Sequence, residues 1–368
     1  MTLKQGAVSG QIPGTPQTAF VPFQKGWLWQ FAHASNVVYG YWKITGSSDA
    51  ALRITAEWQW VLGAYAGSEQ QCGAGTTNTA SDDAAWTTAF LLQAYEVTGD
   101  PVALSHAKGL LDCTWARWSD NGTANCYNAA VVGAGIWYDD TCALKSSYQN
   151  VFALDNYWYY QISGDVTYRT RAIDLDAWIA SNLQRSGQTK FGTTYPNDGL
   201  YWVTLNANGT ISGTATPYRI QPGSSVVLLA ADMAEAVLCA RLYADTGSAA
   251  YLSRAQATAR GIRAYQTVAS GAAFSARDAR VDGWAAVLYA REVAPLVTSD
   301  ATAFGVSGIA ATGTSVMALD RGADNTFSGS WYGPANGADV WSQAALPAQQ
   351  IEMTANAVIW VIAALANP

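Results

Sequence analysis

Two adjacent carboxylates, Asp82 and Asp83, stand in the segment SDDAAWTTAF at the start of a helix-like run. Such a pair can perform glycoside hydrolysis: in retaining enzymes the two carboxyl groups lie about 5 to 5.5 Å apart, one attacking the anomeric carbon and the other protonating the leaving oxygen. Repulsion between the two anions would raise one pKa and keep a proton on the acid. The alternative is that Ser81 caps the helix and both aspartates gain about 0.3 to 1 kcal/mol from its dipole. Taken by itself, the dipeptide favours capping.

Other catalytic chemistries find little support in the sequence. The two histidines, His33 and His106, have no serine or cysteine partner motif, which argues against a catalytic triad or a histidine-rich metal site. No glycine-rich phosphate-binding motif precedes a helix. Asp139 and Asp140 could hold calcium, but a solvated loop or a contact with sugar hydroxyls is favoured, because other oxygen ligands at suitable spacing are not evident. We expect no metal and no organic cofactor, since two carboxyls suffice for the reaction.

Aromatic residues are abundant, with 16 tryptophans and 19 tyrosines. Many stand in loop-like segments: GIWYDD (Trp137, Tyr138), GLYWV (Tyr201, Trp202), GSWYGP (Trp331, Tyr332) and ADVWSQ (Trp341). Flat rings stack on the apolar faces of sugars, so rings in loops beside carboxylates indicate a carbohydrate ligand. The alternative is that the rings fill the core, and for any single tryptophan both readings stay open.

Four segments repeat one pattern, in which a helix ends with aromatic residues, a Thr/Ser-Gly turn follows, and a second helix carries small residues with Arg or Lys. The turn glycines are Gly46, Gly99, Gly164 and Gly247, and the Asp or Ser after each glycine can cap the next helix. The spacing predicts roughly six helical hairpins, which must stack or close to bury their faces. We predict an all-α (α/α)6 barrel, a toroid of helical hairpins, rather than an open solenoid, because the linkers are long, irregular and aromatic. GLYWVTLNANGTISG predicts a small β-hairpin insertion, and residues 1–368 are expected to form one domain.

Composition limits the partners. Only 13% of residues are charged and the net charge is -7, so nucleic acid and anionic membrane surfaces are not expected to bind. The apolar stretch AVIWVIAALA is shorter than the ~20 residues that span a bilayer, so we expect no membrane span. Five cysteines without a C-x-x-C spacing argue against structural zinc and leave one or two disulfides open. Glycosylation-type tripeptides at Asn121 and Asn208 weakly favour export. We expect a monomer, secreted or periplasmic, whose signal peptide is not part of this chain.

Taken in order, the motifs resemble glycoside hydrolase family 76, the endo-α-1,6-mannanases and their fungal cell-wall relatives, over residues 58–366. SDDAAWTTAFLLQAYEVTGD is similar to the family's Asp-Asp-x-x-Trp helix and Thr-Gly-Asp turn. GAGIWYDD and SYQNVFALDNYWYYQISGD resemble its Gly-Gly-Ile-Trp-Trp and Tyr-Lys-Asn segments, and GSWYGPANG with QIEMTANAVIWVIAAL resembles its Trp-x-Gly-Pro element and closing helix. The resemblance rests on order and spacing more than on any one motif.

This resemblance implies an (α/α)6 barrel and a retaining endo-α-1,6-mannanase in which Asp82 is the nucleophile and Asp83 the general acid/base. It also implies substrate contacts at Trp86, Trp137, Tyr138, Asn150 and Trp331, and, on a looser match, at Tyr218 and Gln221. Tyr138 replaces the family's second tryptophan and Gln149 replaces its lysine, while NVFALDN lacks its Ser-Asn. These departures bear on the identity of the sugar more than on the reaction.

Three alternatives stay open at this stage. A transglycosidase that remodels cell-wall glycans would use the same pair with a sugar acceptor in place of water. A non-catalytic carbohydrate-binding protein would use Asp82 and Asp83 only as caps. A lipid cyclase or prenyl-transfer barrel would need a third aspartate in an Asp-Asp-x-x-Asp pattern, whereas Trp86 and small residues follow the pair here.

Overall fold

The structure is a computed structural model that describes residues 28–64, 81–118, 134–138, 144–146, 148–185, 189–190, 193–194, 199–206, 209–212, 229–265, 267–268, 273–274 and 279–315. Its odd-numbered helices are α1 (Leu28–Thr45), α3 (Ser81–Thr98), α5 (Gln149–Ser163), α7 (Leu229–Thr246) and α9 (Ala279–Glu292). The even-numbered ones are α2 (Ser48–Ala64), α4 (Pro101–Trp115), α6 (Val166–Asn182), α8 (Ala249–Tyr265) and α10 (Val306–Ser315), the last preceded by the 3-10 helix η2 (Ala294–Val297).

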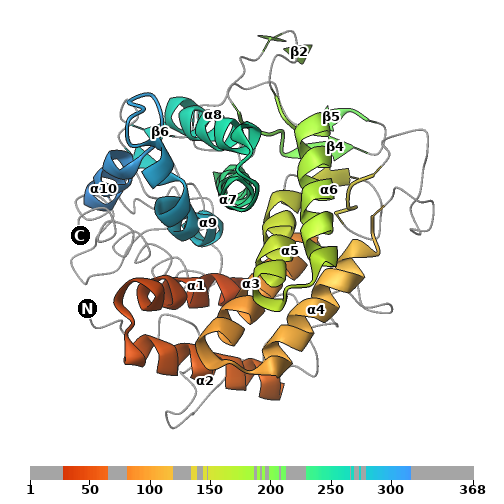
Figure 1. The fold of residues 1–368 in the computed structure, drawn as a ribbon, viewed down its shortest axis with the longest axis vertical. Coiled ribbons are helices and arrows are strands. Elements are labelled where there is room, and N and C mark those ends of the chain that lie inside the picture. Colours follow the sequence, from red (N-terminus) through yellow and green to blue (C-terminus); the bar gives the residue numbers. More distant parts are fainter. Residues whose placement is uncertain are drawn as a thin grey trace, which may run out of the picture.

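The odd-numbered helices form an inner ring. Helix α1 packs against α3, α3 against α5, α5 against α7 and α7 against α9, and α9 returns to α1 (Figure 1). Helices α2, α4, α6 and α8 pack on the outside of α1, α3, α5 and α7. The predicted all-α ring of helical hairpins is therefore confirmed. Four such hairpins lie in the described residues, where α9 is followed by η2 and α10, and residues 316–368 lie outside them. The prediction of a single domain over 1–368 stays a prediction.

The turns that join inner to outer helices follow the predicted chemistry. At the end of α5, Gly164 adopts a left-handed conformation (φ 75°), and its N–H bonds to the carbonyl of Tyr160. The next residue, Asp165, caps α6 by accepting a hydrogen bond from the Thr167 N–H at 2.9 Å. Asp100 caps α4 in the same way. Local turn signals thus set where each hairpin bends.

A half-buried carboxylate, Glu96 of α3, joins three inner helices near these turns. It accepts hydrogen bonds from the Tyr39 hydroxyl of α1 at 2.7 Å and from the Trp158 indole of α5 at 2.5 Å, and it pairs with Lys43. Burial alone would raise the pKa of Glu96, but the hydrogen bonds from Lys43, Tyr39 and Trp158 outweigh it, so the pKa lies below its usual value. The charged form of Glu96 therefore stabilises the ring.

Arg241 of α7 extends these polar contacts from α5 to α9. Its guanidinium lies 5.3 Å from the centre of the Trp158 ring and forms two hydrogen bonds to Glu292 of α9, at 2.7 and 2.8 Å. A cation over an aromatic face and a bidentate carboxylate pair are both favourable for arginine. Polar contacts thus link the five inner helices of the described residues at the end where the turns are short.

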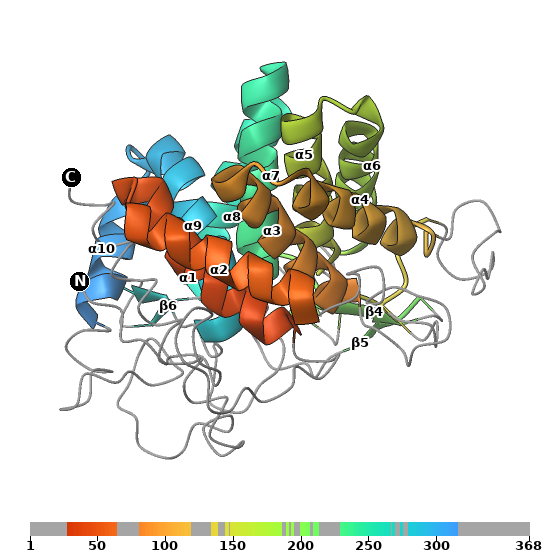
Figure 2. The ribbon, with the colours of Figure 1, turned by 90° about the horizontal axis from the view of Figure 1, so that it is seen from below.

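The longer connections lie at the opposite end, because each short turn leads from an inner helix to its outer partner. These connections hold the strands β1 (Leu144–Ser146), β2 (Thr189–Lys190), β3 (Thr193–Thr194), β4 (Thr204–Asn206), β5 (Ile211–Ser212), β6 (Thr267–Val268) and β7 (Ala273–Phe274). β4 and β5 form the predicted hairpin, and β1 pairs with β4 to make a three-stranded antiparallel sheet, with Lys145 opposite Leu205. Figure 2 shows β4, β5 and β6 on one side of the helices. The first turn of every inner helix faces this end.

Two further observations concern the described part of the chain. No helix within it is long and apolar enough to cross a bilayer. Cys113 takes part in a disulfide, whereas Cys239 is free and buried.

Candidate active site

Asp82 and Asp83 lie in the first turn of the inner helix α3, at the end of the ring that carries the long connections. Both side chains are half-buried. The helix begins at Ser81, so the pair occupies its second and third positions, where the helix dipole favours negative charge. One Asp82 oxygen, Oδ1, accepts a hydrogen bond from the Asp83 N–H at 3.0 Å. This bond involves only one of the two oxygens of Asp82, and the expected cap by Ser81 stays a prediction.

The two carboxyl groups differ in proton affinity. Burial raises the pKa of Asp82 to about 6, against the lowering effect of a hydrogen bond from Tyr138 and of backbone N–H groups. Burial and the charge of Asp82 together raise the pKa of Asp83 to about 8. Between these values Asp82 is ionised while Asp83 keeps its proton. One group can then act as a nucleophile and the other as an acid at the same pH.

Tyr138 joins the α4–α5 connection to the start of α3. Its hydroxyl donates to Asp82 Oδ2 at 3.2 Å, and its carbonyl accepts from the Ser81 N–H at 2.7 Å. Arg117, just after α4, donates to the same carbonyl at 3.4 Å. Tyr138 is half-buried and is thus held at both its backbone and its side chain against the turn that carries the aspartates.

The segment before Tyr138 is anchored by side chains that the sequence analysis did not assign to the site. Gln149 accepts a hydrogen bond from the Ile136 N–H at 2.6 Å through Oε1. Lys145 donates to the carbonyl of Ala134 and lies 4.5 Å from the centre of the Trp137 ring. Both anchors are buried. The position of Tyr138 is therefore set by a buried framework rather than by an exposed loop.

Three of the predicted substrate contacts are buried. Trp86 is 2% exposed and meets Tyr148 edge to face at 5.8 Å, and Trp137 is also 2% exposed. Asn150 is fully buried and donates from Nδ2 to the carbonyl of Ala231 at 2.9 Å, which ties α5 to α7. In this structure neither tryptophan offers a ring face for stacking, so their contact with a substrate stays a prediction. The structure brings Asp82, Asp83 and Tyr138 together, with Trp86 one turn along α3.

The remaining predicted residues divide into two groups. Tyr218, Gln221 and Trp331 lie outside the described residues, as does the Asp139-Asp140 pair. Tyr201 and Trp202 are 4% exposed and pack into the hydrophobic core. For these two rings, the alternative that aromatics fill the core is correct.

Comparisons with known proteins by sequence and by structure give different results. No protein-family profile matches the chain, and no curated protein matches its sequence. Solved structures do match. The GH76A α-1,6-mannanase of Salegentibacter sp. HEL1_6 aligns with a TM-score of 0.66 at 16% identity, over 95% of this chain and 92% of that one. The family 76 mannosidase Bt3792 of Bacteroides thetaiotaomicron aligns with a TM-score of 0.63 at 13% identity, over 93% and 88%. Dfg5 of Chaetomium thermophilum, in complex with glucosamine, aligns with a TM-score of 0.63 at 15% identity, over 98% and 86%.

The chain has the fold of glycoside hydrolase family 76. Two further matches are variants of the Salegentibacter mannanase in which two consecutive aspartates are replaced by alanine or by asparagine. Both variants are described as inactive, and they are in complex with α-1,6-mannotetrose and α-1,6-mannotriose. These statements concern that enzyme, because a likeness at 16% identity establishes the fold alone.

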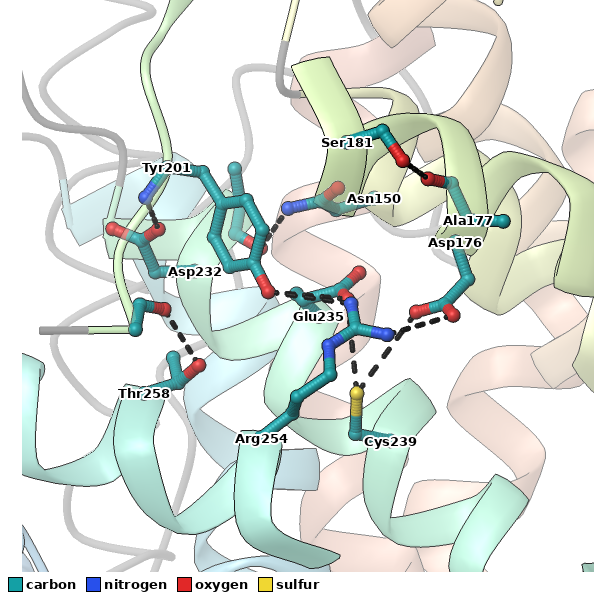
Figure 3. A network of polar contacts seen from close by, with 12 residues as sticks. Asn150, Asp176, Ala177, Ser181, Tyr201, Asp232, Glu235, Cys239, Arg254 and Thr258 are labelled. Atoms are coloured by element: carbon teal, nitrogen blue, oxygen red, sulfur yellow. Dashed lines mark hydrogen bonds and ion pairs between the residues drawn. The ribbon is translucent and has the colours of Figure 1, made fainter. Parts of the chain in front are cut away.

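A second polar cluster lies within this family 76 fold, between α6, α7 and α8 (Figure 3). Asp176, Glu235 and Cys239 place ligand atoms within 4.8 Å of one another, a grouping that could hold a metal ion. Arg254 already occupies both carboxylates, however, with Nη1 at 2.8 Å from Asp176 and Nη2 bonded to Glu235. Burial also raises the pKa of the Cys239 thiol well above its usual value, which makes it a poor metal ligand. The cluster is best explained as a buried ion-pair network that joins two hairpins.

The same network supports one of the long connections. Tyr201 donates its N–H to Asp232 Oδ1 at 3.1 Å and its hydroxyl to Glu235 at 3.4 Å. The sequence analysis missed this cluster, because its members are far apart in the chain and form no motif.

Proposed function

We propose that the protein is a family 76 glycoside hydrolase that cleaves α-1,6-mannan within the chain and with retention of configuration. The observation that carries this proposal is the half-buried aspartate pair at the start of α3, in which the pKa of Asp82 is about 6 and that of Asp83 about 8. The family 76 fold and the inactive double-aspartate variants of a similar mannanase support it.

In this mechanism, ionised Asp82 attacks the anomeric carbon while protonated Asp83 gives its proton to the glycosidic oxygen that leaves. A covalent glycosyl ester forms on Asp82. Asp83, now charged, takes a proton from an incoming water, and the resulting hydroxide attacks the anomeric carbon and releases Asp82. Two inversions at one carbon give net retention. The Asp83 N–H and the Tyr138 hydroxyl hold the Asp82 carboxylate during both steps.

The direct test is hydrolysis of unbranched α-1,6-mannan by the wild type, Asp82→Asn and Asp83→Asn, followed by product sizes and by the anomeric proton spectrum of the first product. We expect internal cleavage, an α-anomer before mutarotation, and rates lowered by at least about 10²-fold in both variants. Asp49→Asn is a matched control, because Asp49 is an exposed aspartate in the first turn of the outer helix α2. A β-anomer first, or wild-type rates in either variant of the pair, would refute the proposal.

A cell-wall transglycosidase is the second candidate. It requires the same ester on Asp82, with a sugar hydroxyl in place of water in the second step. The structural match to Dfg5 in complex with glucosamine supports a glycan other than mannan as substrate or acceptor. Incubation with and without an added oligosaccharide acceptor separates the candidates, because a transglycosidase forms longer products and a hydrolase does not.

A non-catalytic carbohydrate-binding protein is the third candidate, and it predicts glycan binding without turnover. Replacement of Asp82 or Asp83 would then change neither products nor rates, because no products form. The raised and separated pKa values of the half-buried pair argue against this candidate, because such shifts gather at catalytic sites.

The proposed setting is secretion or the periplasm, with the protein acting as a monomer on a polysaccharide or oligosaccharide. The disulfide at Cys113 supports an oxidising compartment. Mass spectrometry of the protein purified from its native host, with and without reduction, would test the compartment through the oxidation state of Cys113.

A further inference from the structure

The two aspartates of the pair share a residue type, a helix turn and a degree of burial, yet the proposed mechanism gives them different roles. We propose that the Tyr138 hydroxyl makes this distinction, by holding Asp82 as the charged nucleophile and leaving the proton to Asp83. Tyr138 is then a positioning residue rather than a sugar-stacking platform. The roles assigned here rest on the proposed function, whereas the difference between the two carboxyl groups does not.

The hydrogen bonds around the pair are asymmetric. Asp82 accepts two, from the Tyr138 hydroxyl at 3.2 Å and from the Asp83 N–H at 3.0 Å. Within the described part of the chain, no donor reaches the Asp83 carboxyl, whose proton affinity is set by burial and by the charge of Asp82. A hydrogen bond to a carboxylate favours its charged form. The single hydroxyl therefore acts on one member of the pair only.

The backbone of Tyr138 is also held in place independently of the Asp82 side chain. The Tyr138 carbonyl is bonded to the Ser81 N–H at 2.7 Å and to the Arg117 guanidinium at 3.4 Å. Because Ser81 directly precedes Asp82, the backbone contact sets the distance between the tyrosine and the first turn of α3. The hydrogen bond to Asp82 thus follows from the fold and does not depend on the side chain finding its own partner.

The segment that carries Tyr138 has little freedom. Gly135 has a left-handed conformation (φ 78°), and a Cβ at this position would lie 2.5 Å from the Trp178 ring, so only glycine fits. Lys145 lies between the Trp137 and Trp178 rings, with Nζ 4.5 and 5.4 Å from their centres. Among the described residues, the charged groups around Tyr138 and the pair are Asp82 and Asp83 of α3, Arg117 just after α4, and Lys145 of β1. Arg117 donates to the Tyr138 carbonyl and Lys145 donates to the Ala134 carbonyl, whereas the Tyr138 hydroxyl donates to Asp82 itself.

The test is titration of both aspartates by carbon NMR, using protein labelled at the aspartate carboxyl carbons. Asp82→Asn and Asp83→Asn assign the two signals, and Tyr138→Phe is compared with the wild type. We expect the Asp82 midpoint to rise by about one pH unit in Tyr138→Phe, and the gap between the two midpoints to narrow. The acidic limb of kcat/KM on α-1,6-mannan should move upward with it. Tyr95→Phe, a half-buried tyrosine at the far end of α3, should change neither.

A second variant is expected to shift the Asp82 midpoint in the opposite direction. It also tests the proposal if Tyr138→Phe does not fold. Placing 3-fluorotyrosine at position 138 makes the hydroxyl a stronger donor, so the Asp82 midpoint should fall. An Asp82 midpoint that stays within about 0.2 pH units in both variants would overturn the proposal, because a purely structural tyrosine would not move it. If the midpoint moves but the wild type cleaves no glycan, the distinction between the two carboxyls stands and the proposed function fails. If the wild type cleaves the glycan and the Asp82 midpoint is unmoved in both variants, the proposed function stands and the proposed role of Tyr138 fails.

Discussion

Replacing Asp83 by asparagine should stabilise the fold at neutral and alkaline pH while it abolishes activity. Burial and the charge of Asp82 raise the pKa of Asp83 from 3.8 to about 8, so the native state holds a proton that the unfolded chain releases. Stability falls with rising pH wherever the native state binds more protons than the unfolded state. The loss of stability caused by the ionisation of Asp83 in the native state is therefore absent near pH 4, grows as the pH rises, and is complete above about pH 8. Asparagine has a similar shape but does not ionise, so it causes no such loss of stability.

The size of this effect follows from the shift. A rise from 3.8 to about 8 is about four pKa units, which at 1.36 kcal/mol per unit sets a ceiling of about 6 kcal/mol. Solvent screens a half-buried group, and part of the shift belongs to its interaction with Asp82, so the measurable gain is reduced to about 1 to 2 kcal/mol. A residue that only capped α3 would behave in the opposite way, because its replacement would lose about 0.3 to 1 kcal/mol of dipole interaction.

Thermal and urea unfolding of the wild type, Asp83→Asn and Asp49→Asn, measured from about pH 4 to 9, provide the assay. Asp49 also lies in the first turn of a helix but is exposed, so its replacement should leave stability nearly unchanged or slightly lower it. The difference between Asp83→Asn and the wild type should grow with pH. Loss of stability in Asp83→Asn at pH 8, or a difference that does not depend on pH, would refute the reasoning.

Three further predictions follow from the rest of the structure. Glu96→Gln should cost about 1 to 3 kcal/mol at pH 7, and the difference should vanish as pH falls through the lowered pKa of Glu96, because the charged form is the stabilising one; unfolding at both pH values checks this. Arg254→Met should cost about 3 to 5 kcal/mol, since Asp176 and Glu235 would lose their cation, and unchanged thermal stability would contradict the buried network. A chelator such as EDTA should leave the rate of glycan cleavage unchanged, because the proposed reaction uses two carboxyl groups, and a loss restored by added metal would contradict this.

Local signals explain what the sequence could predict. A Thr/Ser-Gly turn with an aspartate after it specifies a helix end and the next helix start within a few residues, and the structure has Gly164 and Asp165 in those roles. Asp82 and Asp83 likewise follow from one short segment, so their place at the start of a helix was predictable. That α3 is an inner helix is seen only in the packing of the hairpins.

Helix faces were less predictable. A period of 3.6 residues indicates one apolar face, but α3 is buried on all sides from Ala84 to Ala94, and α7 from Leu229 to Ala240. An inner helix lies between the outer helices and the opposite side of the ring, so its polar face is covered as well. Small residues such as alanine, which carry almost no periodic signal, make this close packing possible.

Non-local contacts were beyond the reach of the sequence. The hydrogen bond between Tyr138 and Asp82 joins residues 56 positions apart, and the ion pair between Arg254 and Asp176 joins residues 78 apart. Both depend on how whole hairpins pack. The resemblance predicts Tyr138 as a substrate contact, which stays a prediction, whereas the hydrogen bond of its hydroxyl to Asp82 is seen only in the structure.

The central claim is that Asp82 forms a bond to the sugar. A fluorinated α-mannosyl fluoride, which loads the enzyme quickly and leaves it slowly, allows the ester to be located by fragmentation mass spectrometry of the peptide that begins α3. The account predicts one added sugar on Asp82, with none in Asp82→Asn. A label on Asp83 would reverse the assigned roles, and turnover of the reagent with no label anywhere would contradict the covalent mechanism.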